Sequence, residues 1–382
     1  YEIALSFLAR GGMSLTFNIL VINPGSTSTK IAWYKNDAEV WTKTIRHSLE
    51  ELSKFDNVIK QLDFRLGAVE GVVKEMGYSY DMLDAVIGRG GIVDPPMPGG
   101  VYQVEEVLIE YLKMCKPWEH ASNLGGLMAN AIAGPRNIPA FIADSVATDE
   151  LDDIARITGL PELPKYSLAH TLNIKSVVRK AAKELGGDWR KLRFIVAHLG
   201  GGFSICAHKD GRMVDLNNAN ENGPFSPERA GTVPSGDLVR LCYSGKYNIK
   251  ELRRKLTGES GFVGYLGTND MRDVKERIKK GDEKAALVYR AMALQVAKEI
   301  ASYSATLEGK VDAIILTGGV VYDEDFAATV TERVQWIAPV LMYPGENEMK
   351  SLAENALRVL KGEEKAASYA DVVKNYKKRE VV

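Results

Sequence analysis

The chain has 382 residues, a length that suits two domains better than a single core. Hydrophobic residues make up 45% and charged residues 26% of it, as in an ordinary globular protein. Lys and Arg number 49 and Asp and Glu number 50. The resulting net charge of −1 leaves no electrostatic footprint for nucleic acid or an anionic membrane.

Three cysteines, Cys115, Cys206 and Cys242, lie far apart in the chain. They form neither a metal-binding spacing nor a disulfide framework, which favours a reducing cytoplasm. No apolar run approaches the roughly 18 residues that a membrane span needs. The chain starts at Tyr1, and residues 1–12 lack the basic region of a signal peptide. We interpret them as a leader or an expression remnant outside the fold.

The first half opens with a predicted β-hairpin. The apolar residues 17–22 end in a polar loop at 23–30 that is rich in glycine and hydroxyl groups, and strand character resumes at 31–34. Helical periodicity and short apolar runs then alternate. Helices are expected at 49–66, 104–114 and 123–133, and single strands at 85–88 and 138–142.

The second half repeats this pattern. After a predicted helix at 168–185, strand 194–199 runs into three glycines and a second strand at 203–207. Phe17 and Phe194 are 194 − 17 = 177 residues apart, and Gly25 and Gly202 are separated by the same interval. Such a repeat suggests a duplicated domain. Helices are further expected at 283–307, 325–336 and 347–361, and strands at 311–316 and 340–343. We therefore predict an α/β protein with two mixed β-sheets covered by helices.

The loop at 23–30 is a candidate anion site. Its small residues let backbone N–H groups approach an anion, and the hydroxyl groups of residues 26–28 add donors. Lys30 adds a positive charge, and Asn23 adds an oxygen for a metal or its waters. The Walker A pattern is absent from the chain. The alternative is a solvated hairpin turn without a ligand.

Two further glycine turns follow predicted strands. The segment His198–Gly202 places three consecutive glycines between apolar strands, which weakens a sheet unless a ligand must come close. The turn Thr317-Gly318-Gly319 follows another strand, and ligands of open α/β sheets bind at such carboxyl ends. A tight strand–helix turn is the alternative there.

The three loops stand in the order found in the superfamily of acetate kinases, sugar kinases, heat-shock ATPases and actin, and the chain resembles its acetokinase family over residues 17–361. The segment 84–91, with Arg89 between glycines, resembles the strand end of acetate kinases. Segments 222–231 and 344–349 resemble the butyrate kinase branch. The resemblance implies an actin-like ATPase (ribonuclease H-like) fold with the nucleotide in the interdomain cleft.

The same resemblance implies a domain division and an activity. The N-terminal actin-like domain would take residues 13–147 and 347–382, and the C-terminal domain, with the nucleotide site, residues 148–346. The implied reaction is reversible: butyrate and ATP give butyryl phosphate and ADP, with Mg²⁺ as cofactor. Isobutyrate or another branched acid is an alternative substrate. The implied assembly is a homo-oligomer, a dimer or a multiple of dimers, without nucleic acid or membrane partners.

Roles carry over to the matching positions. Asn23, Ser26, Ser28 and Lys30 fall in the first phosphate loop, and His198, Gly200, Gly201 and Gly202 in the second. Gly318 and Gly319 form the third nucleotide loop, and Asn269, Asp270, Met271 and Arg272 match the segment that contacts adenosine. The implied catalytic residues are Arg89, Asp144, His120, Asn173 and His170, and the implied metal residues are Asp144, Asn23 and Glu348.

Several of these roles have alternatives. Arg89 would hold the substrate carboxylate and the transferred phosphoryl group, but Asp144 could instead cap the turn at 145–148. Glu346 is close enough to Glu348 to be confused with it. His170 could be a core histidine with a structural role.

The chain also departs from acetate kinases. Asn173 stands where they have an active-site histidine, and His170 lies one helical turn earlier. The segment 231–237 lacks the arginine of their comparable loop, for which Arg229 is a candidate replacement. Both departures argue against acetate as the main substrate.

The chemistry narrows the alternatives. A fatty acid resembles Glu, with a pKa of about 4.3, so it is ionised at pH 7 and needs no general base. Catalysis must instead relieve repulsion between two anions, by Arg89, by Mg²⁺ at Asp144 and by the loop donors. A sugar kinase would need a base for its hydroxyl acceptor. A non-catalytic actin-like ATPase is the rival from another class, and a dehydrogenase is disfavoured because no G-x-G-x-x-G opens a helix.

Overall fold

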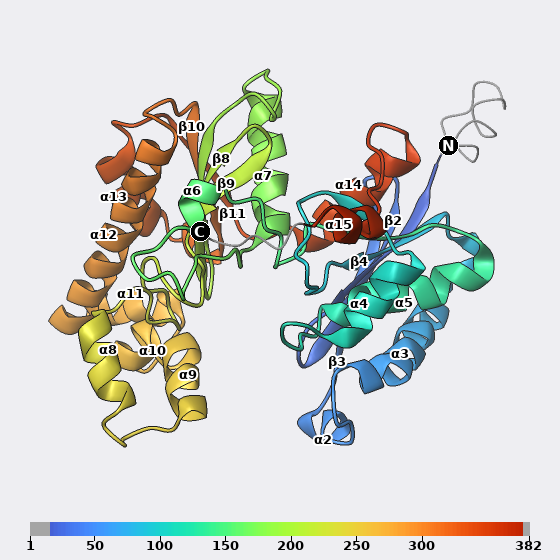
Figure 1. Ribbon diagram of the computed structural model, residues 1–382, viewed down its shortest axis with the longest axis horizontal. Coiled ribbons are helices and arrows are strands. Elements are labelled where there is room, and N and C mark those ends of the chain that lie inside the picture. The colour runs from blue at the N-terminus through green and yellow to red at the C-terminus, as the bar shows by residue number, and fades with distance from the viewer. Residues whose placement is uncertain (1–15, 377–382) are drawn as a thin grey trace. The chain divides into compact units, whose positions relative to one another are not determined.

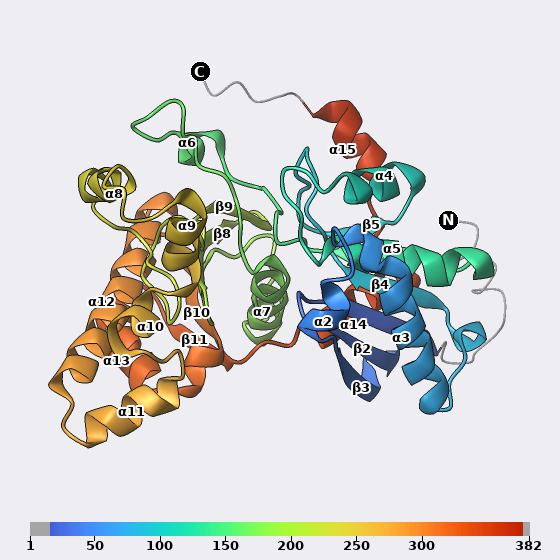
Figure 2. The same cartoon turned by 90° about the horizontal axis from the view of Figure 1, so that it is seen from below.

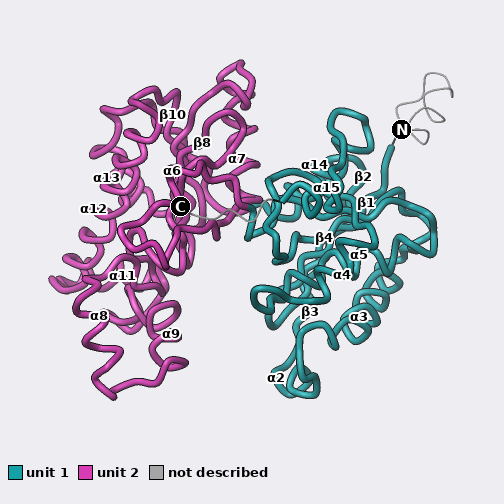
Figure 3. The backbone as a smooth tube through the Cα atoms, in the orientation of Figure 1, with its two compact units in different colours: residues 1–148, 347–380 teal, residues 149–346, 381–382 magenta. Residues whose placement is uncertain are grey.

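The computed structural model describes residues 16–376, which form two compact units (Figure 3). Unit 1 runs to Thr148 and resumes at Asn347, whereas unit 2 takes Asp149–Glu346. The chain thus builds most of unit 1, completes unit 2 and returns to unit 1 near its C-terminus. Residues 1–12, interpreted above as a leader or remnant, lie outside the described part.

Unit 1 is built on a six-stranded mixed sheet with the order β3-β2-β1-β4-β6-β5. The strands are β1 (Asn18–Pro24), β2 (Ser28–Lys35), β3 (Ala38–Arg46), β4 (Ala85–Arg89), β5 (Val101–Gln103) and β6 (Ala140–Ala143). Strands β1, β4 and β6 are parallel neighbours, so their carboxyl ends meet at one edge. The pairs β1–β2, β2–β3 and β5–β6 are antiparallel.

Unit 1 has several helices (Figures 1 and 2). They are α2 (Leu49–Leu52), η1 (Ile59–Gln61), α3 (Leu62–Glu75), η2 (Tyr80–Met82), α4 (Glu106–Met114), α5 (Asn123–Ala133), η3 (Gly134–Arg136), α14 (Glu348–Leu360) and α15 (Tyr369–Asn375). Of these, α3, α5 and α14 contact the sheet. Leu20 and Ile22 of β1 pack into one core with α3, α4 and α5. Because strand side chains alternate between faces, Val21 is buried on the opposite face, and α14 contacts β1 and β4.

Unit 2 repeats the strand order of unit 1. Its five-stranded sheet runs β11-β10-β7-β8-β9, with strands β7 (Phe194–Leu199), β8 (Phe203–Lys209), β9 (Arg212–Leu216), β10 (Ala313–Gly318) and β11 (Val340–Pro344). The pairs β7–β8 and β8–β9 are antiparallel, and β10 is parallel to both neighbours. The sequence β3-β2-β1-β4-β6 of unit 1 has the same directions. The predicted duplication of a mixed sheet is therefore confirmed.

Two helices cover opposite faces of the unit 2 sheet. Ile195 and Ala197 pack with α12, whereas Phe194 and Val196 pack with α7, as the alternation of β-strand side chains requires. The helices of unit 2 are α6 (Asp153–Arg156), α7 (Thr171–Glu184), α8 (Ser235–Cys242), α9 (Ile249–Gly258), α10 (Gly261–Leu266), α11 (Met271–Lys279), α12 (Glu283–Thr306), η4 (Gly319–Tyr322) and α13 (Glu324–Val334).

The prediction of a single helix at 49–66 is wrong. Helix α2 ends after four residues at Leu52, and the chain turns before η1 and α3, which continues to Glu75. Asn57 explains part of the break, because its Oδ1 accepts the Lys60 N–H at 3.1 Å and competes with helical hydrogen bonding. Strands β3, β5 and β9 and helices α6, α8–α11 and α15 were not predicted.

Among residues 16–376, no helix is both long and apolar enough to cross a bilayer. Cys115, Cys206 and Cys242 are all free thiols.

Candidate active site

Three predicted site residues meet at the carboxyl edge of the unit 1 sheet. Asn23 lies near the end of β1, Arg89 ends β4, and Asp144 follows β6 directly. The register places them side by side, because Ile22 pairs with Gly88 and Arg89 with Ala143. Polar side chains therefore leave three adjacent parallel strands at the edge where ligands of α/β sheets bind.

Glu348, the first residue of α14, joins this edge. Arg89 Nη1 lies 2.8 Å from Glu348 Oε1, and Asn23 Nδ2 donates to Glu348 Oε2 at 2.7 Å. Arg89 Nη1 also lies 3.5 Å from Asn23 Oδ1. The side chains of Arg89 and Glu348 keep about a fifth of their surface exposed, so a ligand could reach both. We refer to Asn23, Arg89, Asp144 and Glu348 as the strand-end cluster.

Asp144 is buried and held by the backbone of Gly100. Its Oδ1 accepts the Gly100 N–H at 2.8 Å, and its own N–H donates to the Gly100 carbonyl at 3.1 Å. Its φ of 42° is uncommon outside glycine and costs free energy. In the following turn the hydroxyl of Ser145 accepts the Ala147 N–H. Ser145 thus caps this turn, which is the role considered above for Asp144.

His120 precedes α5, close enough to Arg89 to be influenced by its charge. Burial of the ring and then the positive charge of Arg89 lower the pKa of His120, although part of the residue reaches solvent. Its Nδ1 accepts the Ser122 N–H at 3.2 Å and lies 2.6 Å from Ser122 Oγ. Since Nδ1 accepts, the neutral ring carries its proton on Nε2 and can donate it to an anionic oxygen.

The first phosphate loop is a tight turn between β1 and β2. The Gly25 N–H donates to the Ser28 carbonyl at 2.7 Å, and the side chain of Ser26 is exposed. Lys30 stands directly opposite Asn23 in the antiparallel register, so the two side chains share one face of the sheet. Lys30 forms no ion pair with the residues described, and its charge remains available to a ligand.

In unit 2, the second phosphate loop is anchored by buried His198. Asn173 Nδ2 lies 2.8 Å from His198 Nδ1 and donates to Thr317 Oγ1 at 3.1 Å. With Nδ1 as acceptor, the proton lies on His198 Nε2, which is 3.1 Å from Glu346 Oε1 but makes no hydrogen bond among the described residues. Glu346 thus contacts the second phosphate loop, whereas Glu348 belongs to the strand-end cluster.

His170 stacks on His198, with ring centroids 4.0 Å apart and an interplanar angle of 11°. Its Nδ1 lies 2.9 Å from Ser204 Oγ. His170 and Asn173 therefore both contact the His198 ring. The side-chain amide of Asn173 is used to hold that ring in place.

Two glycines of the nucleotide loops meet close neighbours. A Cβ on Gly202 would lie 2.4 Å from Arg229 Cζ, so the glycine makes room for this guanidinium beside the second phosphate loop. Arg229 Nη1 donates to the Ala219 carbonyl at 3.0 Å. Gly318 has a φ of 94°, and a Cβ there would lie 2.4 Å from the Leu199 carbonyl oxygen.

A pocket of about 780 Å³ opens in unit 2 beside these loops. It is lined by Gly200, Gly201, Pro227, Glu228, Asn269, Asp270, Met271, Arg272, Lys275, Gly319, Val320, Tyr322, Asp323 and Glu346. The whole segment expected to contact adenosine, residues 269–272, lies in its wall. Its volume falls in the range of small-molecule sites.

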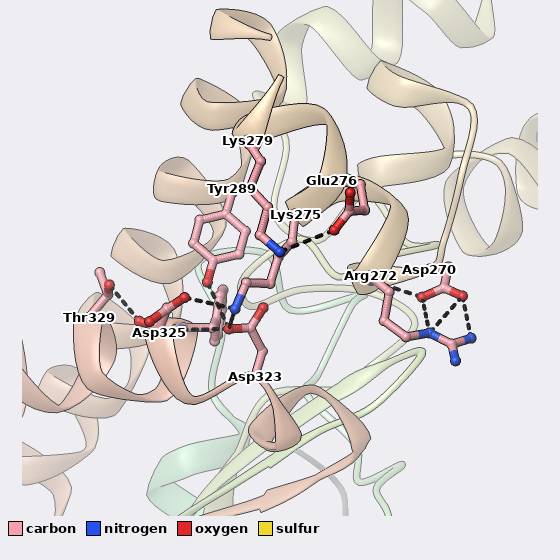
Figure 4. A network of polar contacts seen from close by, with 10 residues as sticks. Asp270, Arg272, Lys275, Glu276, Lys279, Tyr289, Asp323, Asp325 and Thr329 are labelled. Carbon is pink, nitrogen blue, oxygen red and sulfur yellow. Dashed lines mark hydrogen bonds and ion pairs between the residues drawn. The ribbon is translucent and has the colours of Figure 1, made fainter. Parts of the chain in front are cut away.

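Polar contacts order the wall of this pocket (Figure 4). Lys275 Nζ donates to Asp323 Oδ1 at 3.0 Å and to Asp325 Oδ2 at 2.7 Å. Arg272 pairs with Asp270 through Nη2 and Oδ2 at 2.6 Å, and this pairing lowers the pKa of Asp270 to about 2. Asp270 also begins α11 by accepting the Arg272 N–H.

Sequence reasoning missed several residues of these sites. Lys275 and Asp323 sit in the pocket wall, Glu228 holds Asn269 at 2.7 Å, and Arg65 lies beneath the first phosphate loop. None belongs to a glycine loop. A signal existed only for Asp323, because Asp at the start of a helical pattern is a cap.

Comparison with known proteins gives one family. The model of the acetokinase family matches residues 163–367. The chain is 49% identical over 356 residues to butyrate kinase 2 of Clostridium acetobutylicum, covering 93% of this chain and 100% of that protein. It is 48% identical over 354 residues to butyrate kinase 1 of the same organism, covering 92% and 99%.

Solved structures agree on the fold. Acetate kinase from Porphyromonas gingivalis matches with a TM-score of 0.75 at 20% identity, covering 90% of this chain and 100% of that one. Acetate kinase from Entamoeba histolytica matches with a TM-score of 0.71 at 17% identity, covering 88% and 98%. The duplicated actin-like fold that the family resemblance implied is thereby confirmed.

Proposed function

Because the chain belongs to the acetokinase family, we propose that it transfers a phosphoryl group reversibly between ATP and the carboxylate of butyrate. One observation carries the proposal: the guanidinium of Arg89 stands at the carboxyl end of β4 between the polar groups of Asn23 and Glu348. A partly exposed cation there suits an anionic acceptor, because two anions must be brought together. Isobutyrate is the nearest alternative substrate.

The strand-end cluster would organise the reacting groups. Arg89 would exchange part of its contact with Glu348 for the substrate carboxylate, and Lys30 and the loop at 24–28 would bind phosphoryl oxygens. His120, neutral and protonated on Nε2, would donate a hydrogen bond to the same oxygens. Since the acceptor is already ionised, none of these residues has to remove a proton.

A magnesium ion fits the oxygen donors of this cluster. Asp144 and Glu348 offer carboxylates and Asn23 an amide oxygen, which are the ligand types that Mg²⁺ prefers. Among the described residues no group of three or more His, Cys, Asp or Glu forms a metal cage, and Mg²⁺ ordinarily keeps several waters instead. When bound, the ion would neutralise charge on the phosphoryl oxygens.

The unit 2 pocket would take the adenosine of ATP. Its wall combines the apolar surface of Met271 and Val320 with the ordered polar groups of Asp270 and Lys275. Gly200 and Gly201 reach the same pocket, and their backbone would approach the phosphates closely.

The test is ADP release in the presence of acetate, propionate, butyrate, isobutyrate and valerate, measured side by side with glucose and an acid-free control. We expect release to depend on the fatty acid and to be highest with a four-carbon acid. Release with glucose alone would identify a sugar kinase. Release that ignores every acceptor would identify an actin-like ATPase.

We also propose that the chain assembles into a homodimer or a multiple of dimers. The support is an exposed apolar stretch of unit 2, in which Ile154, Ile157 and Leu163 each expose more than half of their surface. Size-exclusion chromatography with light scattering measures the mass. A monomer at micromolar concentration would contradict this assembly.

A further inference from the structure

Arg65 of α3 is a fully buried arginine directly beneath the first phosphate loop. Its Nη1 donates to the carbonyls of Gly25 at 2.9 Å and Ser28 at 3.0 Å, and Nη2 donates to the Ser26 carbonyl at 3.1 Å. Nη1 also lies 3.1 Å from Thr29 Oγ1. One guanidinium thus binds four of the five loop residues from Gly25 to Thr29.

A further loop carbonyl is also held by the protein. The carbonyl of Thr27 accepts the N–H of His47 at 2.9 Å. The Gly25 N–H stays within the turn, where it donates to the Ser28 carbonyl at 2.7 Å. Within residues 16–376, the amides of Ser26 and Thr27 donate no hydrogen bond to the protein. The backbone therefore has the polarity of an anion-binding turn.

Arg65 has no acidic partner among the described residues. Its Nε and Nη2 are held by Gln61 Oε1, at 3.0 and 2.8 Å, which is a neutral acceptor. His47 lies nearby, and burial and then the charge of Arg65 lower its pKa, so His47 is neutral at pH 7. A buried charge without a counter-ion is costly, even when every donor is satisfied. Neutral hydrogen-bond donors could have held the same turn at a lower cost in free energy.

We infer that Arg65 is a positioning residue for phosphate binding, which orients the first phosphate loop and whose charge is balanced by the bound anion. The inference rests on the proposed function, because the anion is taken to be the phosphate chain of a nucleotide. Arg65 does not touch that ligand, since it is fully buried behind the loop. It acts through the carbonyls that it holds and through the charge that it places behind outward-facing amides.

The experiment compares a ligand with phosphates and one without. Affinities for MgATP and for adenosine are measured by calorimetry on the full chain and on the variants Arg65→Met and Arg65→Lys. Arg65→Met should weaken MgATP binding about tenfold or more, because hydrogen bonds to a charged group and the charge itself are lost. Adenosine binding should stay within about twofold. Arg65→Lys keeps the positive charge but lacks the planar guanidinium with its several donors. The loss of MgATP affinity should therefore be smaller in this variant.

A matched control removes a buried arginine elsewhere. Arg156 of unit 2 is also buried, and it pairs with Asp149 at 2.6 Å. Arg156→Met should lower the melting temperature and leave the ratio of the two affinities unchanged. If Arg65→Met does not fold, Arg65→Lys decides by the same ratio.

Each outcome decides the inference. Unchanged MgATP affinity in the Arg65 variants, or an equal loss for both ligands, would reduce Arg65 to a structural residue. A wild-type chain that prefers MgATP but releases no ADP with any fatty acid would overturn the proposed reaction and leave the Arg65 test intact. A wild-type chain that binds MgATP no better than adenosine would overturn both.

Discussion

Arg89 is held by neighbours that are themselves candidate ligands. Glu348 accepts from both Arg89 and Asn23, so the charge of the carboxylate is partly neutralised within the strand-end cluster. A substrate carboxylate or a metal ion would redistribute these contacts without moving a strand. The residues of the strand-end cluster could therefore replace their contacts with one another by contacts with a ligand.

Arg89→Ala should lower turnover by orders of magnitude and leave ATP affinity nearly intact. We expect the guanidinium to bind the acceptor carboxylate, and it belongs neither to the first phosphate loop nor to the pocket proposed for adenosine. Steady-state kinetics with butyrate, together with calorimetric titration of ATP, checks both statements. Wild-type kinetics in this variant would remove Arg89 from the mechanism.

Asp144→Asn should weaken the apparent affinity for Mg²⁺ and slow the reaction while the chain stays folded. Asn keeps an oxygen for the Gly100 N–H and tolerates a φ of 42° better than most residues, but it lacks the negative charge. Rates measured over a magnesium titration, with melting temperature as the control, test this. A collapsed melting temperature with unchanged activity per folded molecule would mean that Asp144 is structural.

At the scale of elements, the loops at strand ends could be predicted because their chemistry is local. Glycines and hydroxyl groups after an apolar run identify the turns near Ser26 and Gly201 without knowledge of any partner. Arg65 could not be found in this way, because its acceptors are backbone carbonyls about 40 residues away in sequence. Because these acceptors are neutral, the sequence contains no acidic residue that would indicate a partner for Arg65.

Helices α8–α11 escaped prediction for a related reason. All four are short, and α9 and α11 are mostly polar: Leu252 is the buried residue of α9 and Val274 that of α11. Local caps do mark some boundaries, such as the capping box between Asn248 and Glu251. Periodicity alone needs a wider apolar stripe than these helices carry.

His208 of β8 should make unit 2 sensitive to acid. Its ring nitrogens have no hydrogen-bond partner among the described residues, and burial, then the charges of Lys175 and Arg179, lower its pKa well below the ordinary 6.5. The unfolded chain then binds more protons than the folded one as the pH falls below 6.5. Stability should drop by about 1.4 kcal/mol per pH unit down to the folded-state pKa.

The variant His208→Leu should remove this sensitivity. At pH 7.5 the neutral ring and leucine should give similar stability, since the ring makes no hydrogen bond. Urea unfolding of both proteins at pH 5.5 and 7.5 measures the difference. An equal loss of stability on acidification in the variant would mean that other groups cause it.

At the scale of the whole molecule, one duplicated unit serves two chemistries. The equivalent strand ends carry Asn23, Arg89 and Asp144 in unit 1, and His198, Gly318 and Glu346 near the ends of β7, β10 and β11 in unit 2. The first set carries two charged side chains and is proposed to bind the acceptor, whereas Glu346 of the second set lines the pocket proposed for adenosine. Placement of the nucleotide in the interdomain cleft stays a prediction.

The enzyme as a whole should prefer four-carbon acids, linear or branched, to acetate. Asn173 is neutral where acetate kinases have a histidine, and segment 231–237 lacks their arginine. The family resemblance implies that these positions lie near the substrate, where a less charged wall would cost less to desolvate, and each buried CH₂ contributes about 0.8 kcal/mol. Two methylenes beyond acetate should then favour butyrate by roughly 1–2 kcal/mol, or about five- to thirtyfold in kcat/KM.

Steady-state kinetics with both acids measures this preference. Uniform binding of the longer chain would lower KM, and better alignment of the carboxylate would raise kcat. An acetate kcat/KM equal to that for butyrate would contradict the chain-length preference but leave the carboxylate kinase activity standing.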